Sequence, residues 1–141
     1  MSKPTYYGVI INFTTVEQYR RNPDFSSFVF QPVIADFSNK SHEYTLTVYA
    51  MLSSSPPQLV PTNPYMLKPF EVKHKNKVQF ANIILDRATL NDLYPAGSDS
   101  ELRIYATGYY NSTDYVTYVA ETDNKQELTL ITKVINPSPP A

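Results

Sequence analysis

Residues 101–122, ELRIYATGYYNSTDYVTYVAET, decide how this chain folds, because they read as two strands that fold back on each other around a polar turn. Apolar and polar residues alternate on both sides of the turn, as in strands that bury one face. The turn itself, Asn111 to Asp114, consists of short polar residues of the kind that tight turns use. The segment therefore predicts an antiparallel hairpin with one face in a core.

The alternation divides the five tyrosines of this hairpin between its two faces. The more apolar sets are predicted to face inward: Leu102, Ile104, Ala106, Gly108 and Tyr110 on the first strand, and Val116, Tyr118 and Ala120 on the second. The remaining residues are predicted to face outward: Glu101, Arg103, Tyr105, Thr107 and Tyr109, then Tyr115, Thr117, Val119 and Glu121. The outer face is thus a mixture of aromatic, hydroxyl and charged side chains.

The segment Glu43 to Leu52 has the clearest alternation elsewhere in the chain. Apolar residues at its even positions predict a half-buried antiparallel strand, with Thr45, Thr47 and Tyr49 on the other side. If this strand lies in the same sheet as the hairpin, Tyr49 extends the same outer surface. Further strands are predicted at residues 6–13, 28–37, 66–74, 77–85 and 126–135.

Prolines and a short helical pattern set the connections. Pro32 should place its strand at a sheet edge or divide it, and Pro56, Pro57, Pro61 and Pro64 predict a long extended loop without ladder pairing. Residues 86–94, DRATLNDLY, are the one segment predicted to form a helical turn, which Pro95 stops. A helical crossover between two strands suits a Greek-key sandwich.

These elements predict an all-β fold, an antiparallel Greek-key β-sandwich of seven or eight strands, either immunoglobulin-like or jelly-roll-like. The passage from Val78 through Tyr105 resembles immunoglobulin-like sandwiches in architecture alone. True immunoglobulin domains have a pair of cysteines and a tryptophan in the core, and this chain has no cysteine and no tryptophan. One domain is expected over residues 1–135, with a Pro-rich tail at 136–141.

Composition limits the classes of partner. The formal net charge is -1, so nucleic acid is not an expected partner. The local basic run from Lys68 to Lys77 is interpreted as a solvated edge in preference to a phosphate site. No stretch approaches the length of a membrane span or a signal peptide, which leads us to expect a cytoplasmic protein, with leaderless export or a mature fragment left open.

The sequence offers little chemistry. His42 and His74 lie in no nucleophile or metal motif, so no enzyme activity and no cofactor are expected. Asp99 could meet Asp114 or Asp123 to hold calcium, but ordinary surface acids are the favoured interpretation.

The outer hairpin face is the candidate binding surface. Its predicted residues are Tyr105, Tyr109, Arg103, Tyr49, Tyr115 and Thr107. Tyrosine and arginine are enriched where proteins meet, which favours a self-associating or accessory subunit that contacts a protein partner or itself. The alternative is a small lectin in which the tyrosines stack on a glycan and Arg103 or a loop acid is the polar anchor. A third interpretation is that cross-strand pairs on this face only stabilise the sheet.

Overall fold

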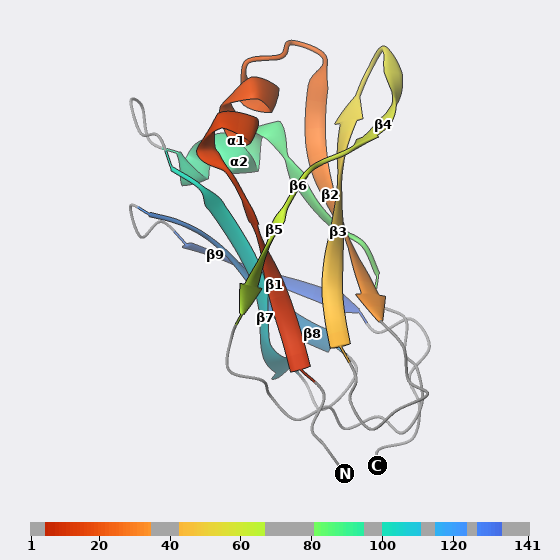
Figure 1. The fold of residues 1–141 in the computed structure, drawn as a ribbon, viewed down its shortest axis with the longest axis vertical. Helices are drawn as coiled ribbons and strands as arrows, with labels where there is room; N and C mark the ends of the chain where they lie inside the picture. The colour runs from red at the N-terminus through yellow and green to blue at the C-terminus, as the bar shows by residue number, and fades with distance from the viewer. Residues whose placement is uncertain are drawn as a thin grey trace.

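The fold was taken from a computed structural model, which describes residues 5–34, 43–66, 81–94, 100–110, 115–123 and 127–133. Nine strands form two antiparallel sheets, so the predicted all-β sandwich is confirmed (Figure 1). The hairpin sheet contains, in spatial order, β5 (Asn63–Met66), β1 (Thr5–Ile11), β7 (Leu102–Tyr110), β8 (Tyr115–Thr122) and β9 (Glu127–Lys133). The opposite sheet contains β6 (Ile83–Asp86), β2 (Phe25–Ile34), β3 (Glu43–Leu52) and β4 (Ser55–Leu59).

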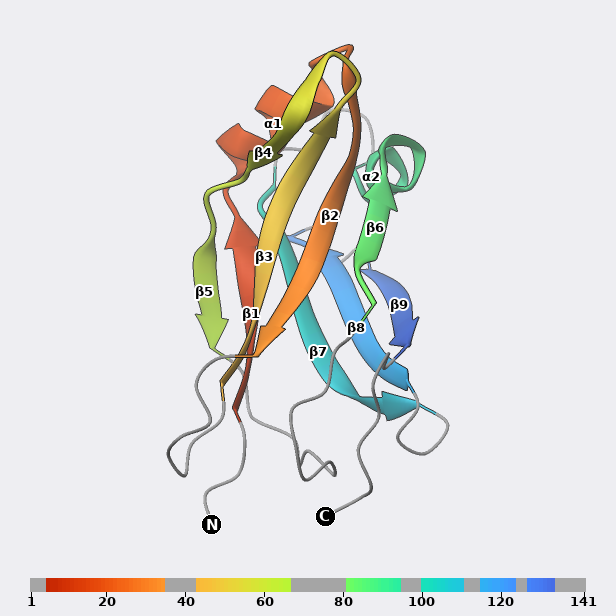
Figure 2. The same ribbon diagram turned by 90° about the vertical axis from the view of Figure 1, so that its right-hand side faces the viewer.

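Two connections hold the sheets together along one side. The start of β1 pairs in parallel with β3 at Thr5 and Tyr6, and the rest of β1 lies in the hairpin sheet. The chain also continues from β4, at the edge of the opposite sheet, directly into β5, at the edge of the hairpin sheet (Figure 2). On the other side, the Thr132 hydroxyl on β9 donates to the carbonyl of Ala81, just before β6.

The core lies between the sheets, and on β3 and the hairpin strands its buried residues are ones that alternation assigned to it. Leu46, Val48 and Ala50 of β3 are buried, as predicted. The hairpin buries the predicted residues Leu102, Ile104 and Ala106 on β7, and Tyr118 and Ala120 on β8. An aromatic group in this core packs Tyr19, Phe25, Phe28 and Phe30, with ring centroids 4.9 to 6.3 Å apart between neighbours.

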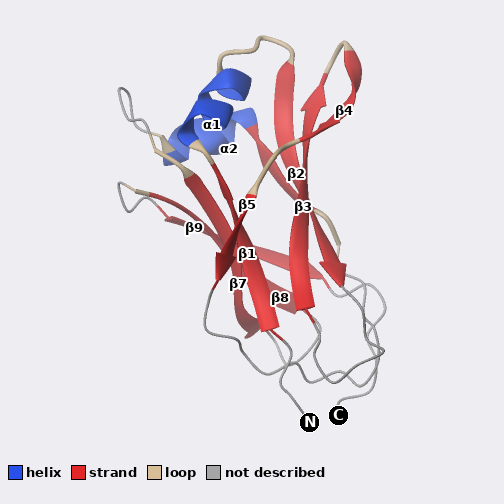
Figure 3. Ribbon diagram, viewed as in Figure 1, coloured by secondary structure: helices blue, strands red, loops and turns tan. Residues whose placement is uncertain are grey.

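Two short helices lie at the same end of the sandwich (Figure 3). Helix α2 (Arg87–Leu93) confirms the predicted helical turn, and the Asp86 carboxylate caps it by accepting from the Thr89 N–H at 2.8 Å. Helix α1 (Phe13–Arg20) was not predicted, because residues 86–94 were the one segment predicted to form a helical turn. It forms because Val16 and Tyr19, three residues apart, bury one face in the core.

Arg87 fastens the two helices to the opposite sheet. Its guanidinium donates to the carbonyls of Arg20, Asn22 and Phe25, which lie at the end of α1 and the start of β2. The carbonyl of Arg20, the last residue of α1, has no partner inside the helix and is thereby satisfied.

The Pro-rich stretch departs from its prediction, because it contains two strands instead of a loop. In β4, Ser55, Gln58 and Leu59 pair with β3, and the register skips where Pro56 and Pro57 stand. In β5, Pro64 pairs with Val9. Both strands are at sheet edges, where a residue without an N–H is tolerated. Together with these two, nine strands lie in the described residues, whereas the predicted strand at 66–74 lies almost entirely outside them.

Pro32 lies at a local edge, in agreement with its prediction. Its strand β2 pairs with β3 on one side at Pro32, whereas β6 covers the other side only from Ser27 to Phe30. The run Ile83, Ile84 and Leu85, at the end of the strand predicted at 77–85, alternates simply, since Ile83 and Leu85 are buried and Ile84 is 65% exposed.

Candidate functional site

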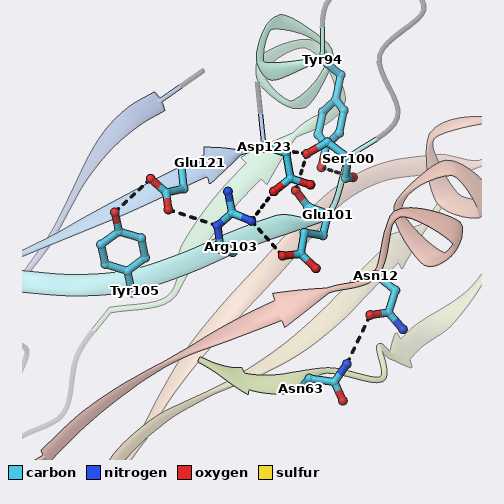
Figure 4. A network of polar contacts seen from close by, with 9 residues as sticks. All are labelled: Asn12, Asn63, Tyr94, Ser100, Glu101, Arg103, Tyr105, Glu121 and Asp123. Atoms are coloured by element: carbon cyan, nitrogen blue, oxygen red, sulfur yellow. Dashed lines mark hydrogen bonds and ion pairs between the residues drawn. The ribbon is translucent and has the colours of Figure 1, made fainter. Parts of the chain in front are cut away.

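Arg103, predicted to face outward on β7, is the centre of a polar network (Figure 4). Its guanidinium contacts three carboxylates: Glu101 at 2.8 Å, Glu121 at 3.1 Å and Asp123 at 2.5 Å. The Arg103 side chain is only 14% exposed, and Glu121 only 16%. The guanidinium therefore already has anionic partners on both hairpin strands, and the cluster contains two more acids than bases.

The charges of this network shift the pKa of its members. The hydrogen bond from Arg103 holds the pKa of the Asp123 carboxyl below its ordinary value. Hydrogen bonds from Arg103 to Asp123, Glu121 and Glu101 together raise the pKa of the guanidinium, although its partial burial acts in the opposite direction. Asp123, weighed above as a calcium ligand, is thus an ion-pair partner of Arg103, whereas Asp99 and Asp114 lie outside the described residues.

Tyr105 extends the network along β7 and also covers a glycine. Its hydroxyl donates to Glu121 at 3.1 Å, and its ring meets that of Tyr65 edge to face, with centroids 5.4 Å apart. Gly8 stands opposite Tyr65 in β5, and a Cβ added to Gly8 would lie 2.6 Å from the Tyr105 Cβ and against the Ile104 carbonyl oxygen. The two rings therefore meet beside a position where only glycine lets β1 and β7 approach. Burial and the Glu121 contact raise the pKa of Tyr105 to about 12.

The network continues from Asp123 to helix α2. The backbone N–H of Asp123 donates to the Ser100 hydroxyl at 2.6 Å, and that hydroxyl donates to the carbonyl of Glu101. The buried Tyr94 hydroxyl donates to the carbonyl of Ser100 at 3.1 Å. The end of α2, the start of β7 and the end of β8 are thereby held together, and burial raises the pKa of Tyr94.

Of the remaining predicted binding residues, Tyr49 lies apart from Arg103 and Tyr105, whereas Thr107 lies on the same strand as these two residues. Tyr49 is half-buried on β3, in the opposite sheet, so the condition under which it would extend the hairpin face is not met. Thr107 is exposed, and its hydroxyl donates to the Thr117 carbonyl at 3.2 Å. The side chains of Tyr109 and Tyr115 lie outside the described residues, although their backbones pair with Val116 and Tyr110.

Sequence reasoning missed three features of this region: the carboxylates that surround Arg103, Tyr65 as the neighbour of Tyr105, and the bulge at Thr107. The register shifts between Ala106 and Gly108, which places Arg103 opposite Glu121. A four-residue turn without a bulge would place Arg103 opposite Thr122 instead. The signal was present in the sequence, because the predicted inward residues are even-numbered on both strands and can face each other only if one residue is inserted.

Exposed apolar side chains lie mainly elsewhere, at the sheet edges. Of the four large apolar side chains exposed in the described residues, three are on edge strands: Leu59 on β4 (67% exposed), Ile84 on β6 (65%) and Ile131 on β9 (50%). The fourth is Phe13 at the start of α1, which is 53% exposed and was predicted to end the first strand, at residues 6–13.

Chemical groups for catalysis or metal binding are scarce in the described part of the chain. A pocket of about 480 Å³ between β3 and the β4–β5 connection is lined by apolar and threonine side chains, Leu46, Thr47, Val48, Leu59, Val60, Pro61 and Thr62. Within the described ranges, no three His, Cys, Asp or Glu side chains form a metal-holding group. His42, His74 and the basic run lie outside those ranges.

Neither α1 nor α2, the helices of the described residues, is long and apolar enough to span a membrane. Comparisons of the chain with protein-family models, with curated proteins and with solved structures found no match.

Proposed function

We propose that this protein is a non-enzymatic β-sandwich that acts through protein contact, as a self-associating structural or accessory subunit. The observation that carries the proposal is the position of the exposed apolar side chains Leu59, Ile84 and Ile131, each on an edge strand. An edge strand offers unpaired backbone groups together with its side chains, and monomeric proteins protect such edges or keep them polar. Exposed apolar residues at edges therefore favour contact with another chain.

The hairpin face is the weaker candidate for that contact. Arg103 is bonded to three carboxylates, and the Tyr105 hydroxyl is bonded to Glu121. A partner that used either group would have to replace these bonds, at a cost that its own contacts must offset. In the glycan hypothesis Arg103 is the polar anchor, but its guanidinium is already bonded to these carboxylates. Glycan binding by this face therefore stays a prediction that no contact in the structure favours.

Light scattering coupled to size-exclusion chromatography tests the proposal directly. Across loading concentrations from micromolar to millimolar, the expected result is a mass that rises to a multiple of the 16.1 kDa chain. A strictly monomeric mass at the highest concentration contradicts self-association. A glycan array run on the same preparation, with and without calcium, separates the alternative, because only the lectin hypothesis predicts bound glycan.

A further inference from the structure

We propose that two copies of this chain associate by antiparallel pairing of β9 with β9, around a two-fold axis at Leu130, which would extend the hairpin sheet across both copies. The inference rests on the proposed self-association and names the surface that performs it. Strand β9 ends the hairpin sheet, and no strand in the described part of the chain pairs with its other edge (Figure 2).

The four edge strands differ in how well they are protected from such pairing. The two on one side contain prolines, Pro56 and Pro57 in β4 and Pro64 in β5, which cannot donate to a new ladder. On the other side, β6 has four residues and β9 has seven, ELTLITK, without a proline. Among the described edges, β9 is thus the longest one on which every residue retains a backbone donor.

The charges of β9 are complementary to those of a second, antiparallel β9. Glu127 opens the strand, Lys133 closes it, and the five residues between them are uncharged. Antiparallel pairing centred on Leu130 puts Glu127 of each copy opposite Lys133 of the other, which gives two opposite-charge pairs in one dimer. Shifting the pairing by two residues removes these pairs, so the charges also select the register.

The neighbours of Glu127 within one chain favour an ion pair with a cation of a second chain. Its cross-strand neighbour on β8 is Glu121, another acid. Glu121 is bonded to Arg103 and Tyr105, whereas Glu127 forms no ion pair with any described residue. A lysine from a second copy would therefore meet an exposed carboxylate without a cationic partner among those residues.

The two faces of β9 suit the same pairing. Leu128 and Leu130 pack against the core and Thr132 is buried, whereas Thr129 and the half-exposed Ile131 face outward. Centring on Leu130 preserves this division, because it places Thr129 opposite Ile131 of the other copy on the outer face. The inner faces of the two copies would then meet through Leu130, which extends the apolar layer beneath the sheet.

Charge reversal tests this pairing through sedimentation velocity at several concentrations. Glu127→Lys alone, and Lys133→Glu alone, should each weaken the wild-type dimer by about tenfold, since each places like charges opposite each other twice. An equimolar mixture of the two variants should dimerise again, because each supplies the charge that the other lacks. Asp92→Lys, at an exposed acid on α2, changes the net charge as Glu127→Lys does and should leave the dimer unchanged.

Engineered cysteines test the register, because the chain has no native cysteine. A mixture of Thr129→Cys and Ile131→Cys chains should form a disulfide-linked heterodimer on mild oxidation, since these positions are opposite each other. Either variant alone should cross-link poorly, as should Ser54→Cys in the exposed β3–β4 turn. A wild-type oligomer that responds to neither charge reversal nor this pairing would overturn the β9 inference and leave the proposed function standing. A wild-type protein that stays monomeric would overturn both.

Discussion

Replacing Arg103 with methionine should destabilise the fold more than any other single change to the hairpin surface. Methionine keeps an unbranched apolar stem of similar length, so the change removes mainly the guanidinium. The loss would leave Glu101, Glu121 and Asp123 without the cation that they share.

The magnitude follows from the exposure of each partner. Glu121 is 16% exposed, and breaking a buried ion pair costs about 3 to 5 kcal/mol because one charge stays buried and unpaired. Glu101 and Asp123 are 37% and 54% exposed, where an ion pair contributes about 1 kcal/mol or less. Since Glu121 keeps its bond from Tyr105 and some contact with water, we expect a net loss of about 2 to 4 kcal/mol.

Thermal and urea unfolding measure this loss. For a domain of 141 residues, the expected fall in the melting temperature is about 10 °C. Arg21→Met is the matched control, since Arg21 is 80% exposed and pairs with Glu17 at 3.3 Å. Glu17 keeps a cationic partner in this variant, because Arg20 also contacts it. This control should cost about 0.5 kcal/mol or less. If both substitutions cost the same, the Arg103 network is not what holds the hairpin end together.

The same variant has a defined pH dependence. Arg103 lowers the pKa of the Asp123 carboxyl in the folded protein, so the folded state binds a proton less readily than the unfolded state. The associated stability is present above the ordinary pKa of 3.8 and is lost as the pH falls through the lower, folded value. The stability difference between the wild type and Arg103→Met should therefore narrow below about pH 4. A difference that stays constant from pH 7 to pH 2 would contradict this origin.

Three further substitutions test the contacts around this network. Gly8→Ala should lower the free energy of unfolding by about 3 kcal/mol in urea, because the new Cβ meets the Ile104 carbonyl; a loss under about 1 kcal/mol would mean that β1 and β7 separate easily. Tyr105→Phe should cost about 1 kcal/mol at neutral pH through the lost bond to Glu121. Because the pKa of Tyr105 in the folded protein is raised to about 12, the free energy of unfolding of the wild type should fall between about pH 10 and pH 12. The free energy of unfolding of Tyr105→Phe should fall less over this range, and an equal fall in both proteins would contradict the raised pKa of Tyr105. Thr122→Val should raise the melting temperature by a few degrees, since the buried Thr122 hydroxyl has no partner among the described residues, and an unchanged or lower value would show that the hydroxyl is satisfied.

Local periodicity predicted the strands well where one face is buried along the whole strand. The bounds of β3 match the predicted segment, and its buried residues are the predicted ones, because alternation reports directly on a half-buried strand. The same holds on β7 from Leu102 to Ala106. Asp86 followed by a short helical pattern predicted α2 for a similar reason, since the capping residue and the helix that it caps are adjacent in sequence.

Features that depend on distant parts of the chain were not predictable in this way. Tyr49 was expected to extend the hairpin face only if its strand lay in the hairpin sheet. Alternation could not decide this, because it gives the side of a strand but not the sheet to which the strand belongs. Prolines were taken to exclude pairing, whereas an edge strand needs only one of its sides to pair. The short pattern of α1 has two β-branched threonines and is stabilised by the burial of Val16 and Tyr19, which only the assembled core provides.

The candidate site shows the same division. The hairpin sequence indicated that Arg103 and Tyr105 face outward, and both lie on the outer side of β7. Their bonds to Glu121 depend on the bulge at Thr107, which sets the register between β7 and β8. Because both side chains are already bonded to Glu121, we propose that the protein contact is made by the strand edge and not by the hairpin face.

Amide hydrogen exchange on β9, compared between dilute and concentrated protein, tests the proposed edge contact most directly. We predict that alternate amides of Glu127–Lys133, those that do not bond to β8, become protected as the concentration rises, while the exposed amides of β4 do not change. Protection on β9 that stays the same while the mass of the particle increases would contradict pairing at this edge.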